Sequence, residues 1–400
     1  MTLRKLINHC ITPQGATGVV IILLWGYQLM IFLRAPFLQI TILKGIVLMS
    51  IPLGILFFSL IGIPYWGKKI HYSDCLFLMT IVFVYFLNFV IYPQNTAGLE
   101  EYAFTFLITV LPFYLVGLLI DINKLYKWFY YLSIIIILAT VFYDLFFIKA
   151  TTYSGTAEAE SYYMSRSYTL LVHVILVLWA TFRKPSLLNL SVLLLGVFMI
   201  FSYGTRGPII CIISFIISYI FFVWRLKKIG VIIFIVTLGV LVFLRYDILT
   251  IMHSFSTKLG MSTRVFEYIQ EGMFIGLASS SGRDEIAINL LDKIWQNNGI
   301  GFGIRGIREG YAHNIFIDFW FEYGLFVGSL LLLLILVTII KGYKNCRSEL
   351  EKGFLLLLFS RGFMQLLISN TYLNAPYLFI LLGYCIRIYR RAKSNTIQVE

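Results

Sequence analysis

Long apolar runs recur along almost the whole chain, and they limit what it can fold into. Of the 400 residues, 60% are hydrophobic and only 13% are charged, which leaves too little polar surface to cover a water-soluble domain. A run of about 20 apolar residues can cross the hydrocarbon core of a bilayer as a helix. We therefore predict an all-α polytopic membrane protein.

Twelve of these runs are counted as membrane-spanning helices. They cover 16–33, 45–63, 75–91, 102–120, 128–148, 167–182, 187–203, 208–223, 229–244, 314–340, 353–371 and 376–389. The first could pass for a signal peptide, but no small-residue cleavage site follows it, so it is kept as a helix. The predicted organisation is nine spans over 1–244, a long loop over 245–312, and three spans with a tail over 313–400.

Lysine and arginine are distributed unevenly between the predicted connections. With the N-terminus inside, the inner segments hold 19 of the 32 cations. The short outer loops hold only Arg34, Lys44, Lys149, Arg166 and Arg206. Because cytoplasmic loops are enriched in Lys and Arg, we predict that both termini are cytoplasmic. The net charge of +13 then reflects topology and does not indicate nucleic-acid binding.

The 68-residue outer loop, 245–312, is too long to be a simple connection, so we expect it to be folded and functional. A helix is predicted to start at Ser281 as N-cap, with Asp284 as its capping-box partner. Its apolar stripe is expected to lie on the membrane surface and comprises Ile286, Leu290, Leu291, Ile294 and Trp295. The stretch from Asn297 to Gly303, rich in asparagine and glycine, then ends the helix. None of the five cysteines falls in an outer loop, so no disulfide framework is expected.

His313 enters the tenth predicted span directly from this polar loop. An unperturbed imidazole titrates near neutral pH, so His313 could accept a proton from a hydroxyl group at the membrane surface. Asn314 beside it could cap the helix. The alternative is a histidine that only makes local hydrogen bonds at a helix start.

Several arginines are candidates for binding an anionic substrate. Arg206 lies in a tight turn between two spans, where it could hold a phosphate or could extend toward lipid headgroups. Arg283 falls in the first turn of the loop helix, where backbone N–H groups already favour anions. Arg305 and Arg308 flank the glycine-rich stretch.

Ionisable residues inside spans are costly and usually face a partner or a cavity. We predict that Glu322 pairs with Arg361, or alternatively that Arg361 faces a substrate channel. Asp318, Asp144 and His173 are interpreted as structural. The first outer loop, 34–44, contains no Asp or Glu, and no HExxH, CxxC or carboxylate cluster predicts a metal site elsewhere.

Three short motifs, taken in order, resemble the Wzy-type O-antigen and capsule polymerases and the O-antigen ligase superfamily. They are Thr205-Arg206-Gly207, then Ser281-Gly282-Arg283 leading through Trp295 to Gly299-Ile-Gly301-Phe-Gly303, and finally Ala312-His313-Asn314 with Glu322-Tyr323-Gly324-Leu325 and Gly328. The similarity in topology covers the whole chain, including the long outer loop. The motifs themselves are short and degenerate.

The resemblance implies glycosyl transfer at the outer face of the bacterial plasma (inner) membrane. The donor would be a glycan on undecaprenyl diphosphate, and the acceptor a sugar hydroxyl. His313, Arg206 and Arg283 would be catalytic, with no metal or other cofactor. Arg305, Arg308, Asn314 and Arg361 would help to bind substrate. The partners implied are the two glycans, the lipid bilayer and a chain-length regulator protein, and no nucleic acid.

Two other functions remain open at this stage. An O-antigen ligase would transfer the glycan to lipid A core, although the glycine-rich stretch followed by Ala-His-Asn is more similar to polymerases. A flippase or exporter of lipid-linked glycans would be expected to spread cationic residues through several spans. Most of the candidate residues here cluster at the predicted outer face instead, which favours the enzyme.

Overall fold

The computed structural model describes residues 3–27, 41–146, 157–203, 205–224, 283–306 and 312–397, with residues 250, 253, 254 and 257. Regular structure in these residues is helical throughout, as the sequence predicts. The chain forms two compact units. Unit 1 comprises Met1–Thr17, Ile61–Ile122 and Ser280–Glu400, and unit 2 comprises Gly18–Leu60 and Asn123–Ser279.

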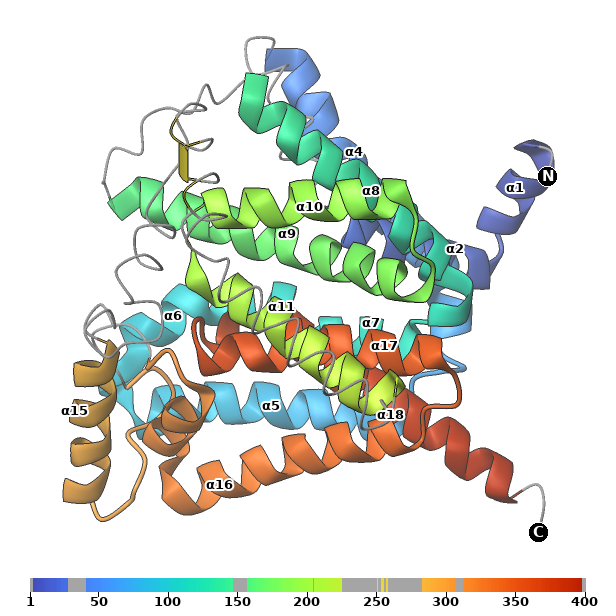
Figure 1. Cartoon of the computed structure of the whole chain (residues 1–400). Helices are drawn as coiled ribbons and strands as arrows, with labels where there is room; N and C mark the ends of the chain where they lie inside the picture. Colours follow the sequence, from blue (N-terminus) through green and yellow to red (C-terminus); the bar gives the residue numbers. More distant parts are fainter. Residues whose placement is uncertain are drawn as a thin grey trace. The chain divides into compact units, whose positions relative to one another are not determined.

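Unit 1 is built around its last helix, α18. Its helices are α1 (Leu3–Cys10), α5 (Tyr72–Ile91), α6 (Thr96–Phe104), α7 (Phe113–Leu119), α15 (Arg283–Gln296), α16 (Ile315–Lys344), α17 (Glu349–Leu358) and α18 (Pro376–Ile397). Helices α7, α16 and α17 all pack on α18. Figure 1 shows α5, α16 and α18 as the long helices of this unit, with α15 lying crosswise to α5 and to the long part of α16.

Glycines let the backbones around α18 approach each other closely. A Cβ atom on Gly117 of α7 would lie 2.3 Å from the carbonyl oxygen of Ile380, and one on Gly383 would lie 2.1 Å from that of Tyr114. On α16, a Cβ atom on Gly342 would lie 2.6 Å from the Cys385 sulfur. Small residues at helix contacts are the usual way in which apolar helices associate in a membrane, because they maximise van der Waals contact.

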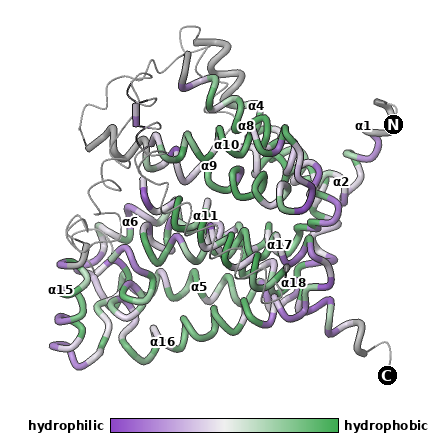
Figure 2. The backbone as a smooth tube through the Cα atoms, in the orientation of Figure 1, coloured by the Kyte–Doolittle hydropathy of each residue, from purple (hydrophilic) through white to green (hydrophobic). Residues whose placement is uncertain are grey.

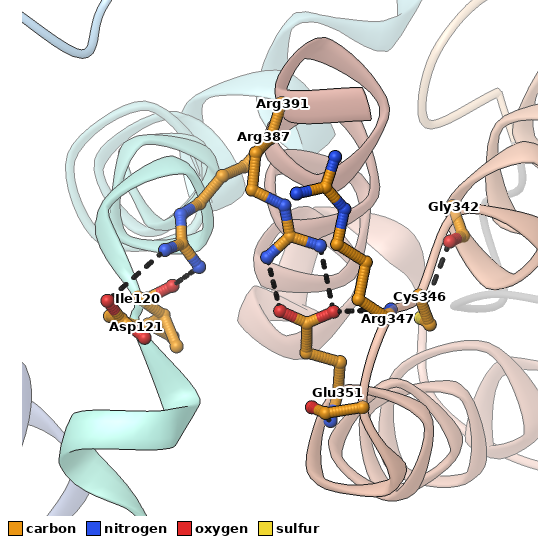
Figure 3. Close-up of polar contacts among 9 residues, drawn as sticks. Ile120, Asp121, Gly342, Cys346, Arg347, Glu351, Arg387 and Arg391 are labelled. Carbon is orange, nitrogen blue, oxygen red and sulfur yellow. Dashed lines mark hydrogen bonds and ion pairs between the residues drawn. The ribbon is translucent and has the colours of Figure 1, made fainter. Parts of the chain in front are cut away.

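Arginines near the end of α18 connect it to three other helices. The Arg387 guanidinium donates to the carbonyl oxygen of Ile120 and lies 3.7 Å from the Asp121 carboxylate, at the end of α7 (Figure 3). Arg391 donates two hydrogen bonds to Glu351 at the start of α17 (Figure 3). Arg390 binds Asp74 of α5 at 2.6 and 2.8 Å. These contacts fix this end of the helix bundle.

The carboxyl of Glu351 and the neighbouring thiol of Cys346 have shifted pKa values. Burial opposes ionisation of Glu351, but hydrogen bonds from Arg391 and from the backbone N–H of Arg347 outweigh it and hold the pKa of this carboxyl below its usual range. Burial raises the pKa of the neighbouring Cys346 thiol to about 12. The Cys346 thiol is therefore protonated at neutral pH, which disfavours the nucleophilic thiolate form.

Unit 2 has helix α9 (Ala157–Arg183) at its centre. The other helices are α8 (Ile122–Phe146), α10 (Leu187–Ser202) and α11 (Arg206–Tyr219), and α2 (Pro13–Trp25) and α4 (Thr41–Trp66) lie mostly in this unit. Most side chains of α9 from Tyr168 to Ala180 are buried. His173 is among them and bonds the hydroxyl of Ser133 at 2.9 Å, which agrees with a structural role.

Arg166 does not lie in an outer loop as predicted, because α9 begins nine residues earlier, at Ala157. Its guanidinium is buried and pairs with Asp144 at 2.7 Å. The hydroxyl of Tyr203 donates to the same carboxylate. Asp144 therefore has the structural role expected of it. Its partner, Arg166, was predicted to lie in an outer loop instead.

Seven helices in the described part of the chain are long and apolar enough to span a membrane. They match the second to sixth, eighth and tenth of the twelve predicted spans. The first and seventh appear as the shorter apolar helices Pro13–Trp25 and Leu187–Ser202. The ninth, 229–244, lies outside the described residues. Figure 2 shows the hydrophobic residues that dominate most of these helices.

The fourth and eleventh predicted spans are interrupted. A π-helical turn, Thr105–Val110, separates α6 from α7, and Pro112 begins the second part. After α17 the chain continues through a π-helical turn, Phe359–Phe363, and short 3-10 turns before Pro376 starts α18. Such turns do not change hydropathy, so the apolar pattern alone predicts one continuous helix.

Candidate functional site

His313 lies in a strained turn at the start of α16. Its φ angle of 56° is in the left-handed region, which residues other than glycine adopt at a cost of about 1–3 kcal/mol. The Asn314 side chain accepts a hydrogen bond from the Phe316 N–H at 2.9 Å, so the predicted N-cap is confirmed. The turn fixes the direction in which the half-buried imidazole leaves the backbone.

Asp318 holds this turn from inside the helix. Its Oδ1 accepts a hydrogen bond from the backbone N–H of Ala312 at 2.8 Å, immediately before His313. The residue is only 2% exposed, and Oδ2 has no hydrogen-bond partner among the described residues. We interpreted Asp318 as structural from sequence, and its link to His313 was missed. The available signal was the spacing, because a side chain near the start of a helix can reach back to the residues before it.

Glu322 lies one helical turn further along and is also buried. It accepts hydrogen bonds from the hydroxyl of Tyr372 at 2.6 Å and from the backbone N–H of Arg305 at 3.0 Å. Tyr372 and Tyr323 are hydrogen-bonded through their hydroxyls at 2.8 Å. The predicted pair of Glu322 with Arg361 is therefore wrong.

The glycine-rich stretch, 299–303, docks on a break in α16. Gly324 has φ 82° and ψ 165°, which interrupts the helix and frees the carbonyl groups before it. The N–H groups of Phe302 and Gly303 bond the carbonyl oxygens of Phe321 and Glu322, and the Leu325 N–H bonds that of Gly299. These bonds satisfy buried polar groups that the break would leave unpaired.

Side chains from α5 and from the turn that follows it hold the other side of this stretch. Asn95 donates to the carbonyl oxygens of Phe302 and Ile304, at 2.9 and 3.2 Å. Asn88 accepts from the Ile304 N–H at 2.8 Å. The stretch is therefore fixed between α16 and the end of α5. It places Arg305, which follows it, next to Glu322.

Arg305, in unit 1, has a buried side chain and also a left-handed backbone, at φ 61°. Its guanidinium lies over the Tyr102 ring, 4.4 Å from the centroid, and 3.5 Å from the exposed carboxylate of Glu101. It also interacts electrostatically with Asp318 and Glu322. A cation in this position balances the buried acidic groups, whether or not it also contacts substrate.

The helix predicted in the loop is present as α15, which begins at Arg283 and ends at Gln296, just before the glycine-rich stretch. The predicted N-cap Ser281 and Arg308 lie outside the described residues, and for Arg283 only the backbone is described. The prediction that the whole apolar stripe of this helix lies on the membrane surface is wrong, because part of the stripe is buried in protein. Leu290 and Ile294 are buried against Ala312, Ile317 and Phe321 at the start of α16.

Two further candidates, Arg361 and Arg206, have other described contacts or positions. Arg361 is in the π-helical turn after α17, with its guanidinium 4.7 Å from the ring centroid of Tyr377. Arg206 is the first residue of α11 and belongs to unit 2. The Thr205 hydroxyl before it donates to Ser167 at 2.6 Å and so does not cap α11.

Unit 1 thus brings together His313, Asn314, Arg305, Asp318 and Glu322. A half-buried imidazole at a helix start, in a turn that a buried carboxyl group holds through the Ala312 N–H, is suited to accept or donate a proton. Comparisons with protein-family models, with curated proteins and with solved structures return no match.

Proposed function

We propose that this protein is a Wzy-type polysaccharide polymerase. It would join undecaprenyl-diphosphate-linked oligosaccharide units into O-antigen, capsular polysaccharide or exopolysaccharide at the outer face of the bacterial plasma membrane. The observation that carries the proposal is the arrangement of His313, which stands in a fixed turn where a polar loop enters a long apolar helix. A lipid-linked substrate presents its sugar at the same kind of boundary.

In the proposed reaction His313 is the general base. It takes the proton from an acceptor hydroxyl as that oxygen attacks the anomeric carbon of the donor. The bond from this carbon to the diphosphate breaks, and undecaprenyl diphosphate leaves with the electron pair. A single displacement of this kind inverts the anomeric centre. Arg206 and Arg283 would neutralise the leaving diphosphate, as guanidinium groups can do in place of a metal.

Asp318 and Arg305 have supporting roles in this scheme. Asp318 fixes the backbone on one side of His313, so the imidazole is oriented before substrate arrives. Arg305 supplies a cation that interacts electrostatically with the buried carboxyls of Asp318 and Glu322. Arg308, Asn314 and Arg361 stay candidates for contacts with the sugars.

The test is reconstitution of the purified protein in liposomes with a lipid-linked oligosaccharide, followed by separation of the products by length. Wild type should give a ladder of longer glycans, and His313→Ala and Arg206→Ala should each abolish it. His9→Ala and Lys127→Ala are matched controls, because both residues are exposed and lie in other helices. The controls should give the wild-type ladder.

Three results would contradict the proposal. A ladder from His313→Ala would remove His313 from the mechanism. Transfer only when lipid A core is supplied would show a ligase. Movement of the lipid-linked glycan across the bilayer without lengthening would show a transporter.

A further inference from the structure

Helix α15 carries three kinds of surface. At about 100° per residue, its exposed polar side chains fall within one arc. They are Glu285, Asn289, Asp292, Lys293 and Gln296. Opposite this arc, Leu290 and Ile294 are buried against α16. Between the two lies a third surface, which is apolar and exposed.

The third surface consists of Ile288 and Trp295, seven residues apart on α15. They are 58% and 68% exposed. Residues seven apart lie almost directly above one another on a helix, so the two side chains form one ridge. Ile300, just after the helix, is 61% exposed and extends the apolar surface. We call Ile288, Trp295 and Ile300 the apolar flank.

The apolar flank adjoins the exposed apolar part of α16. Ile300 lies beside the break at Gly324, since the Leu325 N–H bonds the carbonyl oxygen of Gly299. Beyond the break, Phe326 is 82% exposed, and Leu333 and Leu334 are also exposed. The segment from Leu325 to the end of α16 has about 20 residues, or about 30 Å of helix, which matches the hydrocarbon core.

Before the break, α16 is covered by protein instead of being exposed. Phe319, Phe321 and Glu322 are all buried. The break therefore marks a change of surroundings along one helix, from a first third covered by protein to a remainder with one exposed apolar face and one face packed on α18. Helix α15 lies at this level and runs crosswise to the long part of α16 (Figure 1). In Figure 2 α15 is mixed in polarity, while α16 is largely hydrophobic.

We propose that α15 is an interfacial helix that lies in the surface of the outer leaflet. The apolar flank is inserted at the level of the lipid headgroups and upper acyl chains, and the polar arc faces water. Trp is enriched at this depth because its ring is apolar and its indole N–H can still reach a polar partner. The position of α15 is thereby fixed by two contacts, its packing on α16 and its insertion into lipid.

This assignment differs from the one that the sequence pattern suggests. The pattern directs the whole apolar stripe toward lipid, whereas the structure commits Leu290 and Ile294 to α16 and leaves only one side for the bilayer. Because Ala312 and Ile317 share that packing, the position of α15 also sets the position of the His313 turn. The lipid contact itself does not depend on the proposed function.

The test uses tryptophan fluorescence of the full-length protein in liposomes of phosphatidylcholine and phosphatidylglycerol. Lipids brominated close to the headgroup quench tryptophans at that depth, and iodide quenches those in water. The difference between wild type and Trp295→Phe isolates the emission of Trp295. We expect this emission to be quenched by the brominated lipids and protected from iodide. Trp179→Phe is the matched control, because Trp179 is fully buried and its emission should respond to neither quencher.

Two results would overturn the proposal. Quenching of the Trp295 emission by iodide alone would place the apolar flank in water. Protection from both quenchers, with a cross-linked dimer formed by a Trp295→Cys variant, would show that a second copy of the chain covers it. Trp295→Phe is a conservative change at an exposed position, so loss of folding does not compromise the comparison.

Discussion

At the scale of single residues, the turn at His313 shows how a strained backbone is maintained. The left-handed conformation costs about 1–3 kcal/mol, and two helix residues offset it. Asn314 caps the first turn of α16, and Asp318 binds the N–H of Ala312. Backbone strain that is held in this way is frequent at functional sites, where it aims a side chain.

Asp318→Ala should destabilise this turn and Asp318→Asn should largely preserve it. Alanine leaves the buried N–H of Ala312 without an acceptor, which costs about 1–3 kcal/mol, whereas asparagine keeps an acceptor oxygen. Thermal unfolding in detergent measures the difference. If the proposed function is correct, the alanine variant should also lower kcat more than it raises KM. Equal stability of the two variants would contradict the role given to Oδ1.

The carboxyl of Glu351 should make stability depend on pH. Its pKa is lowered in the folded protein, so its contribution is present above the ordinary pKa of about 4.3 and is lost as pH falls through the folded value. Glu351→Gln should cost about 1–2 kcal/mol at neutral pH, a discounted value because Arg391 is partly exposed. The difference from wild type should shrink below about pH 4.

Glu349→Gln is the matched control for Glu351, since Glu349 lies in the first turn of the same helix and is exposed. It should change the unfolding temperature little at any pH. A Glu351→Gln variant whose destabilisation persists unchanged at low pH would show that the effect comes from packing and not from charge.

At the scale of elements, the glycine-rich stretch and the break in α16 form one structure. A Cβ atom on Gly301 would lie 2.5 Å from both the carbonyl oxygen of Glu322 and the N–H nitrogen of Gly324. Because the atoms that this Cβ would meet belong to the backbone, no change of side-chain conformation can relieve the clash. The central glycine of Gly-Ile-Gly-Phe-Gly and the glycine of Glu-Tyr-Gly are therefore explained by one close backbone contact.

Gly301→Ala should separate the stretch from α16 and cost about 1–3 kcal/mol, as overpacking of a tight contact does. Gly67→Ala is the control, because the nearest atom to its Cβ would be 3.9 Å away. The measurement is thermal unfolding of both variants in the same detergent. Similar unfolding temperatures for the two would show that the stretch is not tightly docked.

The apolar pattern predicted where helices lie better than where they break. The loop helix, its end before Asn297 and the cap at Asn314 were all predicted, since each depends on residues close in sequence. The interruptions after Phe104 and Leu358 leave the apolar pattern unchanged and were missed. The partner of Glu322 was also wrong, because Tyr372 is 50 residues away and no local pattern links the two.

At the scale of the whole molecule, the uneven distribution of charge is the main basis for orientation. The cluster around Arg387, Arg390 and Arg391 pairs its cations with Asp121, Asp74 and Glu351. Pairing within the protein does not weaken the topological argument, because the rule counts Lys and Arg and is not a net-charge rule. The orientation that follows is a prediction that labelling can test.

Helix α5 provides the most direct test, because each of its flanking turns contains an exposed residue. Lys69 precedes it and Gln94 follows it, and its 20 residues are about 30 Å long, enough to separate the two positions by one bilayer. In a chain whose own cysteines are replaced, a membrane-impermeant maleimide should label Gln94→Cys in intact spheroplasts. Lys69→Cys should react only after permeabilisation. The opposite pattern would invert the topology and would place His313 on the cytoplasmic side, where the proposed glycosyl transfer does not occur.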